Sequence, residues 1–554
     1  MTNEEIAELF KWYANLSELH DGNPFKIKSY AAAAFKIDKL STPLEGKSVA
    51  ELEAMEGIGK SIAKKIFEIN QSGSFTELVE LINDTPQGVI DLFKVKGIGP
   101  KKIAYIWKQL GIESMGELLY ACNENRLAQA KGFGLKTQQA VKESIEFIFS
   151  NANKFHYAKL EKPALQLLNE LQQQPFVSRI SFTGELRRKN ETLDHISLLI
   201  AANQTQLLAY LQNSMEVSVH ENHLSFRYNE GYPVSVILTD EAHFDETLFI
   251  STAAPAHLKQ LEQAGANIKA GNEQAIYASA GLAFIEPEMR EGLGEVEKAR
   301  TNSLPLLIEH SHLKGILHNH TNYSDGANTL TEMAVFCKEA GFEYLGICDH
   351  SKSAQYAGGL SEATIIKQHA EIDALNKELA PFKIYKGIES DILGDGSLDY
   401  SNDVLATFDF VVASVHSNLK MTEEKAMSRL LKAIENPYTD ILGHPTGRLL
   451  LMREGYPVDF KTMIDACAAN GVAIEINAHP YRLDLDWRWI DYALNKQVML
   501  SINPDAHDTA GFYDMHYGIN VARKGGLYKE MCLNAKDKNA FETWLQQRRK
   551  QKFG

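Results

Sequence analysis

Nine residues of the types that bind metal ions recur in the C-terminal part of the chain, each at or just after the end of a short apolar run. They are His318, His320, Asp325, His350, Glu389, His416, His444, Asp505 and His507. Any one of these histidines alone would be interpreted as an ordinary core or surface residue, but six of the 18 histidines share this placement. Imidazole and carboxylate ligands suit zinc, manganese and iron(II). The set therefore predicts two or three divalent ions with one bridging carboxylate, a centre suited to phosphoester chemistry.

The apolar runs in front of these residues predict strands, and segments of helical length separate them. We expect strands over 315–317, 343–349, 383–388, 408–415, 440–443, 472–477 and 498–504, and helices over 329–340, 361–379 and 421–436. Strands that alternate with helices predict a parallel sheet or a closed barrel. Because functional residues of such barrels lie at the carboxyl ends of the strands, the nine residues should form one site.

These motifs resemble those of a known family. The segment from His318 to Gly326 is similar to the first motif of the PHP (polymerase and histidinol phosphatase) metallo-phosphoesterases, and the segments around the other six ligands resemble its later motifs. The resemblance implies a distorted (βα)7 barrel with a trinuclear site. By the family pattern, His318, His320, Glu389 and Asp505 would hold the first ion; Glu389 would bridge to the second, with His416 and His444; Asp325, His350 and His507 would hold the third.

Three further residues beside this centre are predicted to bind substrate: Arg448, Asn477 and Arg482. Asn477 ends a predicted strand, and each arginine follows a ligand-bearing or strand-ending segment. A guanidinium group can donate two parallel hydrogen bonds to one phosphate. For each arginine a surface ion pair is the alternative.

A Gly–apolar–Gly motif followed by a basic helix occurs three times in the N-terminal third. Its copies carry Gly57, Gly59 and Lys60; Gly97, Gly99, Lys101 and Lys102; and Gly132, Gly134 and Lys136. The glycines permit a tight turn with exposed N–H groups, and a helix N-terminus favours an anion. The motif resembles the helix-hairpin-helix, which binds the DNA backbone without reading bases. A plain αα-hairpin is the alternative for one copy, but three copies favour DNA binding.

The block from Asn23 to Tyr30 resembles the lyase domain of family X DNA polymerases. Its Lys26 and Tyr30 are candidates for binding a DNA 5′ end. In that resemblance Lys65 falls on the Schiff-base lysine of the 5′-deoxyribose-phosphate lyases, a role that needs a depressed pKa. A solvated Lys65 or a contact between Lys65 and the DNA backbone is the interpretation we favour.

The segment from Phe182 to Thr192 is similar to the strand and turn of the family X polymerase palm. In working members of that family three carboxylates bind magnesium. Here those positions fall on His195, Ser197 and Ser235. Magnesium requires hard oxygen ligands, and phosphoryl transfer depends on it. We therefore predict that nucleotidyl transfer is absent.

The resemblance covers nearly the whole chain and gives a multidomain fold class: an α-helical helix-hairpin-helix N-terminal region, an α+β polymerase-like palm and thumb, and a C-terminal distorted (βα)7 PHP barrel. The expected domains are a lyase-like helical domain (1–88), a fingers-like domain with two further hairpins (89–150), a degenerate palm (151–245), a thumb (246–300), a linker (301–313) and the PHP domain (314–554). At 554 residues, several domains are expected.

Composition limits the possible functions. The chain is 44% apolar with a net charge of −15, which argues against a protein that coats nucleic acid electrostatically. Five scattered cysteines without a Cys-x-x-Cys pair indicate free thiols in a reducing compartment. No secretory signal pattern or membrane-length apolar run is present. These features predict a cytoplasmic, non-membrane protein, and a monomer is the default.

The function that these observations predict is a DNA-repair phosphoesterase. We expect a 3′-5′ exonuclease, with processing of abasic sites or 3′ ends as an extension, acting on gapped, nicked or 3′-ended DNA with two or three zinc, manganese or iron ions. The alternatives are a PHP phosphatase of a small ester such as histidinol phosphate, an active family X DNA polymerase, and a non-catalytic DNA-binding protein.

Overall fold

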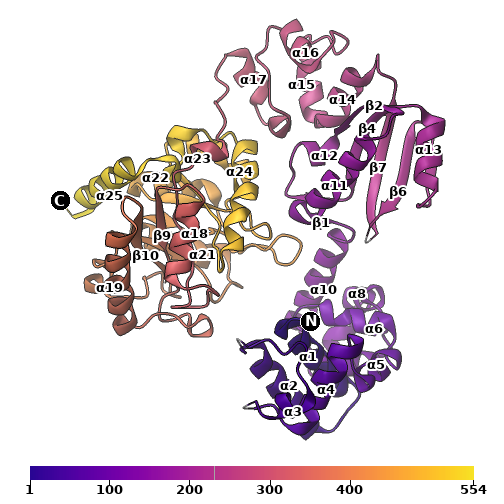
Figure 1. Ribbon diagram of the computed structural model, residues 1–554, viewed down its shortest axis with the longest axis vertical. Helices are drawn as coiled ribbons and strands as arrows, with labels where there is room; N and C mark the ends of the chain where they lie inside the picture. Colours follow the sequence, from indigo (N-terminus) through magenta and orange to yellow (C-terminus); the bar gives the residue numbers. More distant parts are fainter. Residues whose placement is uncertain (41, 56, 230, 554) are drawn as a thin grey trace. The chain divides into compact units, whose positions relative to one another are not determined.

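The computed structural model describes residues 1–40, 42–55, 57–229 and 231–553, and the chain divides into two compact units (Figure 1). Unit 1 is Met1–Ala152 and unit 2 is Asn153–Gly554. The fold class expected from the sequence is confirmed, while the finer domain boundaries remain predictions. Among the described helices, none combines the length and the apolar character that crossing a bilayer requires.

Unit 1 is helical. Its α-helices are α1 (Asn3–Leu19), α2 (Pro24–Asp38), α3 (Val49–Glu53), α4 (Lys60–Ser72), α5 (Thr76–Asn83), α6 (Gln87–Asp91), α7 (Pro100–Leu110), α8 (Met115–Asn123), α9 (Arg126–Gln129) and α10 (Leu135–Ser150). The central apolar residues of the three motifs, Ile58, Ile98 and Phe133, are buried in one core. Because the motif's apolar residue points inward, the glycines on either side of it face solvent.

The first part of unit 2 contains a five-stranded sheet in the order β2-β4-β7-β6-β5. Its strands are β2 (Val177–Phe182), β4 (Ile196–Ala202), β7 (Tyr232–Thr239), β6 (His223–Tyr228) and β5 (Ser218–His220), and a separate pair joins β1 (Phe155–His156) to β3 (Thr192–Leu193). The accompanying helices are α11 (Tyr157–Gln172), α12 (Gly184–Arg187) and α13 (Gln204–Gln212). Strands β4 and β7 are parallel neighbours, and Ser197 lies opposite Ser235 in their register.

A small helical segment follows the sheet, with α14 (Phe244–Thr252), α15 (Pro255–Gln263), α16 (Glu273–Ser279) and α17 (Glu295–Arg300). It has an apolar core of its own. The carboxylate of Glu273 in α16 accepts hydrogen bonds from both Arg187 of α12 and the fully buried Arg290. This ion-paired group fixes the segment to the palm-like sheet.

The rest of unit 2 is a parallel seven-stranded sheet in the order β14-β13-β12-β11-β10-β9-β8. Its strands are β8 (Gly315–Ile316), β9 (Tyr344–Ile347), β10 (Lys383–Asp391), β11 (Phe410–Ser414), β12 (Ile441–Leu442), β13 (Ala473–Asn477) and β14 (Leu500–Asn503). A bridge between Asn319 and Ala506 joins the two ends of the series, so the sheet forms a nearly closed barrel. Each of the seven strands overlaps its predicted range.

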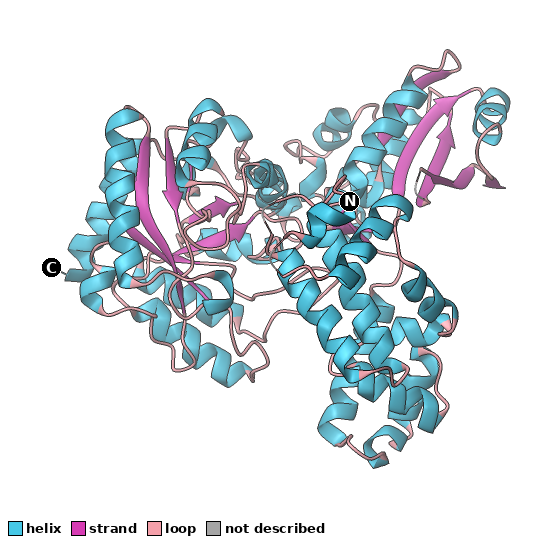
Figure 2. Ribbon diagram, turned by 60° about the horizontal axis from the view of Figure 1, so that its bottom comes forward, coloured by secondary structure: helices cyan, strands magenta, loops and turns pink. Residues whose placement is uncertain are grey.

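Helices surround the barrel on the outside, as Figure 2 shows. They are α18 (Leu330–Glu339), α19 (Glu362–Glu378), α20 (Asn402–Leu405), α21 (Glu423–Glu435), α22 (Phe460–Asn470), α23 (Ile490–Asn495), α24 (Met515–Lys524) and α25 (Lys538–Phe553). Alternate strand residues point inward: Phe410 and Val412 join an inner cluster, whereas Val411 and Ala413 pack toward the outer helices. Phe541 of α25 completes the inner cluster.

A buried lysine connects the barrel to the preceding parts of unit 2. The side chain of Lys524, at the end of α24, is only 3% exposed. Its Nζ donates hydrogen bonds to the carbonyl oxygens of Arg188 and Glu288 and pairs with the carboxylate of Glu291. The indole ring of Trp487 lies 4.5 Å from the same ammonium group.

Candidate metal centre and nucleic-acid interface

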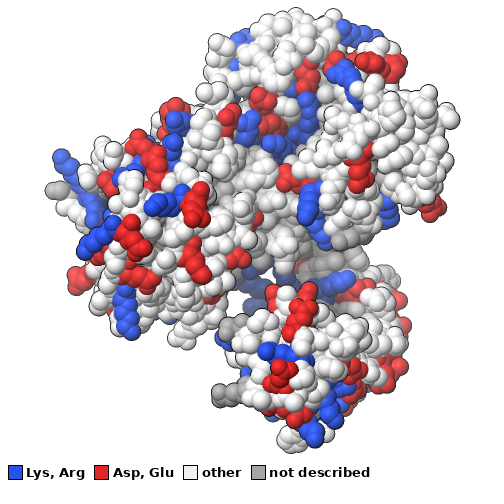
Figure 3. All heavy atoms as spheres, viewed as in Figure 1, with Lys and Arg blue, Asp and Glu red and all other residues white. Residues whose placement is uncertain are grey.

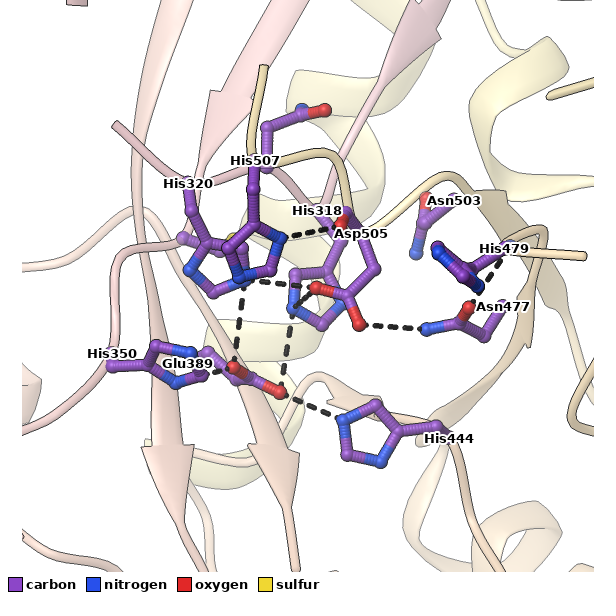
Figure 4. Close-up of polar contacts among 12 residues, drawn as sticks. His318, His320, His350, Glu389, His444, Asn477, His479, Asn503, Asp505 and His507 are labelled. Atoms are coloured by element: carbon purple, nitrogen blue, oxygen red, sulfur yellow. Dashed lines mark hydrogen bonds and ion pairs between the residues drawn. The ribbon is translucent and has the colours of Figure 1, made fainter. Parts of the chain in front are cut away.

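The carboxyl ends of the barrel strands and the loops that follow them carry all nine predicted ligands, and Figure 4 shows the part of this cluster around Glu389 and Asp505. Eight of them stand within or just after a strand: His318 and His320 after β8, His350 after β9, Glu389 within β10, His416 after β11, His444 after β12, and Asp505 and His507 after β14. Asp325 lies in the loop between β8 and α18. Parallel strands that end at one rim thus bring together side chains that are far apart in sequence.

Glu389 is the centre of this cluster. One carboxylate oxygen, Oε1, lies 3.0 Å from His444 Nε2, 3.1 Å from His416 Nε2 and 3.4 Å from His318 Nε2. The other, Oε2, lies 2.9 Å from His350 Nδ1. The Glu389 side chain is fully buried. A carboxylate with imidazoles on both oxygens has the geometry that the predicted bridging ligand needs.

The remaining two acidic ligands lie on either side of His320. Asp505 Oδ1 is 2.9 Å from His320 Nε2 and 3.6 Å from His318 Nε2. Asp325 Oδ1 is 3.4 Å from His507 Nε2 and 3.9 Å from His320 Nδ1, and its Oδ2 is 3.6 Å from His350 Nε2. Each of these two carboxylates therefore lies within 4 Å of at least two imidazole rings.

Three groups of ligand atoms lie within 4.8 Å of one another: His320, Asp325, His350 and His507; His318, His320 and Asp505; and His350, Glu389 and His416. They overlap the predicted three-ion sorting without reproducing it, since the group of Glu389 and His416 includes His350 and not His444, although His444 also contacts Glu389. The assignment of ligands to individual ions stays a prediction.

Four buried ligand atoms that face this cluster lack hydrogen-bond geometry although charged neighbours are close: His318 Nε2, His320 Nδ1, His350 Nδ1 and Glu389 Oε2. Buried polar atoms without hydrogen bonds are destabilising and therefore rare. Divalent cations would satisfy such nitrogen and oxygen atoms, and the donor set suits zinc, manganese or iron(II). The residues therefore fit the metal ions that the sequence predicts.

The ligands differ in their protonation. Burial lowers the pKa of His350 and His416, but Glu389 outweighs burial, together with Asp325 at His350 and Asp391 at His416, and raises these pKa values to about 10 and about 9. Burial and the neighbouring His350 lower the pKa of His320 to about 3. The neighbouring carboxylates thus favour the protonated form of His350 and His416. Metal binding must displace these protons, because only neutral imidazole coordinates.

Two acidic residues that orient ligands were missed by the sequence analysis. The fully buried Glu475 in β13 lies 2.6 Å from His318 Nδ1 and accepts a hydrogen bond of 2.7 Å from the backbone N–H of His444. Asp391 pairs with His416 Nδ1. Carboxylates that bond the second nitrogen of a ligating histidine fix its ring orientation. The position of Glu475, two residues before Asn477 on the same strand face, was the available signal.

The predicted substrate residues separate into different roles. Arg482 Nε lies 3.7 Å from Asp505 Oδ2, which keeps it a candidate for phosphate binding. Asn477 is buried and donates a 3.0 Å hydrogen bond to Asp505, so it positions a ligand. The guanidinium of Arg448 bonds Asp486 and the carbonyl oxygens of Arg482 and Leu483, which anchors the loop, and substrate binding by Arg448 stays a prediction.

The hairpin turns in unit 1 have the predicted backbone form. Gly57, Gly97 and Gly132 have φ angles of +87°, +93° and +87°, the left-handed conformation that favours glycine. The next glycine of each motif is the N-cap of α4, α7 or α10 and leaves the helix without a side-chain cap. Lys60, Lys101 and Lys136 are exposed nearby, whereas Lys102 is half-buried. Each turn thus presents free N–H groups beside a cation.

The structure shows the surroundings of three predicted DNA-binding side chains in unit 1, Tyr30, Lys26 and Lys65. Tyr30 is only 3% exposed and packs against Phe10 and Phe75, which leaves little of its side chain for DNA. Lys26 remains exposed above the Tyr30 ring. Lys65 pairs with Glu68 and Glu77; burial opposes the shift, but these carboxylates raise its pKa. That direction is opposite to what a Schiff-base lysine needs.

Surface charge is mixed. On the face of the molecule shown in Figure 3, acidic and basic side chains are interspersed. This pattern agrees with local contacts to phosphates at the hairpins rather than a continuous basic surface.

The palm-like sheet places the predicted lost polymerase positions together. Ser197 and Ser235 are register partners on β4 and β7, His195 immediately precedes β4, and a Cβ atom on Gly184 would lie 3.3 Å from the Ser197 hydroxyl. Asp194 is exposed at the same strand entrance. Within the described part of the palm-like sheet, no cluster of metal-binding side chains is found.

Comparison with known proteins gives matches along most of the chain. Residues 1–75 match the helix-hairpin-helix domain, residues 89–146 the SAM-like helix-hairpin-helix tandem, and residues 317–479 the PHP domain. The chain is 33% identical to the DNA polymerase/3′-5′ exonuclease PolX of Bacillus subtilis (strain 168), over 98% of this chain and 99% of that protein. It is 25% identical to a probable phosphatase of Thermoanaerobacter sp. (strain X514), over 43% of this chain and 96% of that protein.

Proposed function

Because the chain belongs to the family X DNA polymerases that carry a C-terminal PHP domain, we propose that it is a DNA-repair exonuclease that shortens strands from the 3′ end. Membership implies a metal-dependent phosphoesterase whose helix-hairpin-helix domains bind DNA. The finer proposal covers the direction of digestion, gapped, nicked or 3′-ended substrates, processing of abasic sites or 3′ ends, and action as a monomer. The relative from Bacillus subtilis has a 3′-5′ exonuclease in its name.

The observation that carries this proposal is the complete set of nine ligands, in which the buried Glu389 lies among the other eight. When bound, neighbouring divalent ions supply Lewis-acid activation of a phosphodiester and a nucleophile at neutral pH. The protein's own residues supply the rest. Glu475 and Asp391 orient imidazoles, Asn477 holds Asp505, and Arg482 is placed to bind a phosphate oxygen.

We propose further that the palm-like sheet transfers no nucleotides. The positions of the three family carboxylates hold His195, Ser197 and Ser235, and imidazole and hydroxyl groups do not replace hard carboxylate ligands for magnesium. The palm would then serve as scaffold. Active polymerase remains the outcome that a direct assay has to exclude.

A small-molecule phosphatase is the second candidate, because a probable phosphatase matches 43% of this chain over 96% of its own length. Three hairpin turns with free N–H groups favour DNA instead, since a phosphatase of a small ester has no use for a DNA-binding domain. A purely structural role for the metals fits poorly with so many ligands, because structural zinc sites are closed and four-coordinate.

The test uses gapped DNA whose primer is labelled at the 5′ end in one sample and at the 3′ end in another, incubated with manganese, with and without nucleoside triphosphates. Stepwise shortening of the 5′-labelled primer without extension is the expected result. The control variant His318→Ala/His320→Ala should abolish digestion while DNA affinity stays within a few-fold. Intact DNA with the manganese-loaded protein, or primer extension, would overturn the corresponding part of the proposal.

A further inference from the structure

Two exposed tyrosines lie beside the candidate metal centre on loops that follow different strands. Tyr356 lies in the short 3-10 helix Gln355–Ala357 after β9, and Tyr481 lies in the loop after β13. Their exposed fractions are 70% and 43%. Aromatic rings of this size are usually buried, so exposed rings beside a site indicate a binding surface. Tyr356 and Tyr481 are called the rim tyrosines below.

The strand order separates the two loops around the barrel. Strands β10, β11 and β12 lie between β9 and β13 on one side, and β8 and β14 lie between them on the other. The loops therefore enter the rim from opposite sides, with the ligand cluster between them. This placement depends on the barrel's topology alone.

Tyr356 faces the ligands. Its ring centroid is 6.3 Å from that of His350. The ring therefore lies beside a member of the ligand cluster, while most of it stays open to solvent.

Tyr481 is held in place from behind. Its ring centroid is 4.3 Å from the His156 ring and 5.3 Å from the His479 ring. Its carbonyl oxygen accepts a 2.6 Å hydrogen bond from the N–H of Leu450. The next residue, Arg482, lies against Asp505, and Figure 4 shows His479 beside Asn477 and Asp505. The ring is thus fixed before any ligand arrives.

We propose that the rim tyrosines stack on the bases at the 3′ end of an unpaired DNA strand and thereby seat its last phosphodiester at the metal centre. This inference rests on the proposed exonuclease function. Stacking on aromatic rings is the usual way in which proteins hold single strands without reading their sequence, because every base has a π face. The rings make the barrel selective for nucleotide esters, and Arg482 adds a charge for the phosphate.

The experiment compares two 5′-labelled single strands that differ only at the 3′ terminus, one ending in thymidine and one in a tetrahydrofuran abasic residue. With the wild-type protein and manganese, we expect KM to be about tenfold higher for the abasic end and kcat to change little. In Tyr356→Ala and Tyr481→Ala the thymidine end should lose this advantage, so that the two strands behave alike. Tyr356→Phe and Tyr481→Trp should keep it, because the ring remains.

The matched control is Tyr438→Ala, a half-buried tyrosine just before β12 and therefore at the other end of the barrel. It should retain the wild-type ratio between the two strands. Fluorescence anisotropy of the same labelled strands in chelator, without metal ions, should show the same preference as binding. Thermal melting checks that each variant is folded.

The outcomes separate the two proposals. If the wild type digests neither strand, the exonuclease function itself is wrong. If it digests both with equal KM, or if the alanine variants keep the wild-type ratio, digestion stands and the stacking role is wrong. Equal losses in Tyr356→Phe and Tyr356→Ala would assign the effect to the hydroxyl and would also overturn stacking at that residue.

Discussion

Buried side chains that contact the ligands fix the orientation of the ligand rings in the candidate metal centre. Glu475 contacts His318 through one carboxylate oxygen and the backbone of His444 through the other, and it also accepts hydrogen bonds from the Asn503 amide at 3.0 Å and the Asn477 amide at 3.5 Å. One buried carboxylate therefore orients residues from two neighbouring parts of the rim. In sequence such a residue is indicated only by its position on a strand face that also carries site residues, as Glu475 is by Asn477.

Replacing Glu475 with glutamine should weaken metal binding. The amide keeps the volume but offers only one acceptor, so His318 and the His444 backbone can no longer both be held by carboxylate oxygens. We expect an affinity loss of about 10- to 100-fold for zinc or manganese, measured by competition with a chromophoric chelator. The exposed Glu378→Gln at the end of α19 is the control and should bind as the wild type does. Unchanged affinity in Glu475→Gln would show that these contacts do not orient the ligands.

At the scale of elements, the start of a helix is the unit that binds phosphate in unit 1. Gly99 is the N-cap of α7 with an extended φ of −109°, and an added Cβ atom would meet nothing within 4 Å. Aspartate is a favoured N-cap residue, so Gly99→Asp should fold as well as the wild type or slightly better. Its carboxylate would occupy the N–H groups and repel phosphate. We expect DNA affinity to fall roughly five- to tenfold in a filter-binding or anisotropy titration.

The matched substitution Gly99→Ser caps the same helix without a charge. It should lose less affinity than Gly99→Asp at equal thermal stability. If both variants bind DNA as tightly as the wild type, the turn at Gly97 to Gly99 is only a structural αα-hairpin.

A second prediction concerns the contact between α16 and α12. Burial opposes ionisation of Glu273, but hydrogen bonds from Arg187 and Arg290 lower its pKa from 4.5 to about 2. Because the folded pKa is depressed, the stabilisation is complete above pH 4.5 and is lost as the pH falls toward 2; the gap corresponds to about 3 kcal/mol. The free energy of unfolding of the wild type should therefore exceed that of Glu273→Gln at pH 7. Denaturant titrations should show this difference shrinking between pH 4.5 and pH 2; a constant difference would refute the ion-pair account.

At the scale of the whole molecule, the two units have separate cores. The apolar cluster of unit 1 lies within residues 1–148, and the clusters of unit 2 begin at residue 155. Lys154 lies between them and is exposed. Brief trypsin treatment should cleave there first and give two protease-resistant fragments, because exposed junctions are the preferred sites of nicking. Mass spectrometry identifies the cut, and Lys154→Gln should delay it. Early cleavage inside the barrel would contradict this division.

The sequence predicted features that depend on local pattern, and missed those that depend on packing between distant segments. The seven strands and the nine ligands at their ends follow from apolar runs and residue types, and the three turns follow from paired glycines. Burial of Tyr30 and the loop contacts of Arg448 depend on segments elsewhere in the fold. The rim tyrosines come from two loops whose placement on opposite sides of the ligand cluster only the strand order reveals.

The buried ammonium group of Lys524 has a consequence for how this chain can change over time. Its partners are Arg188, which follows α12 beside the palm-like sheet, and Glu288 and Glu291, which lie between α16 and α17. A chain that discarded those segments would leave a cation in the barrel wall without acceptors, at a penalty of several kcal/mol. The palm-like part would then be kept as a folding partner of the barrel, independently of any nucleotidyl transfer. On this view, a segment can be retained because another part of the chain packs against it, even where that segment catalyses no reaction.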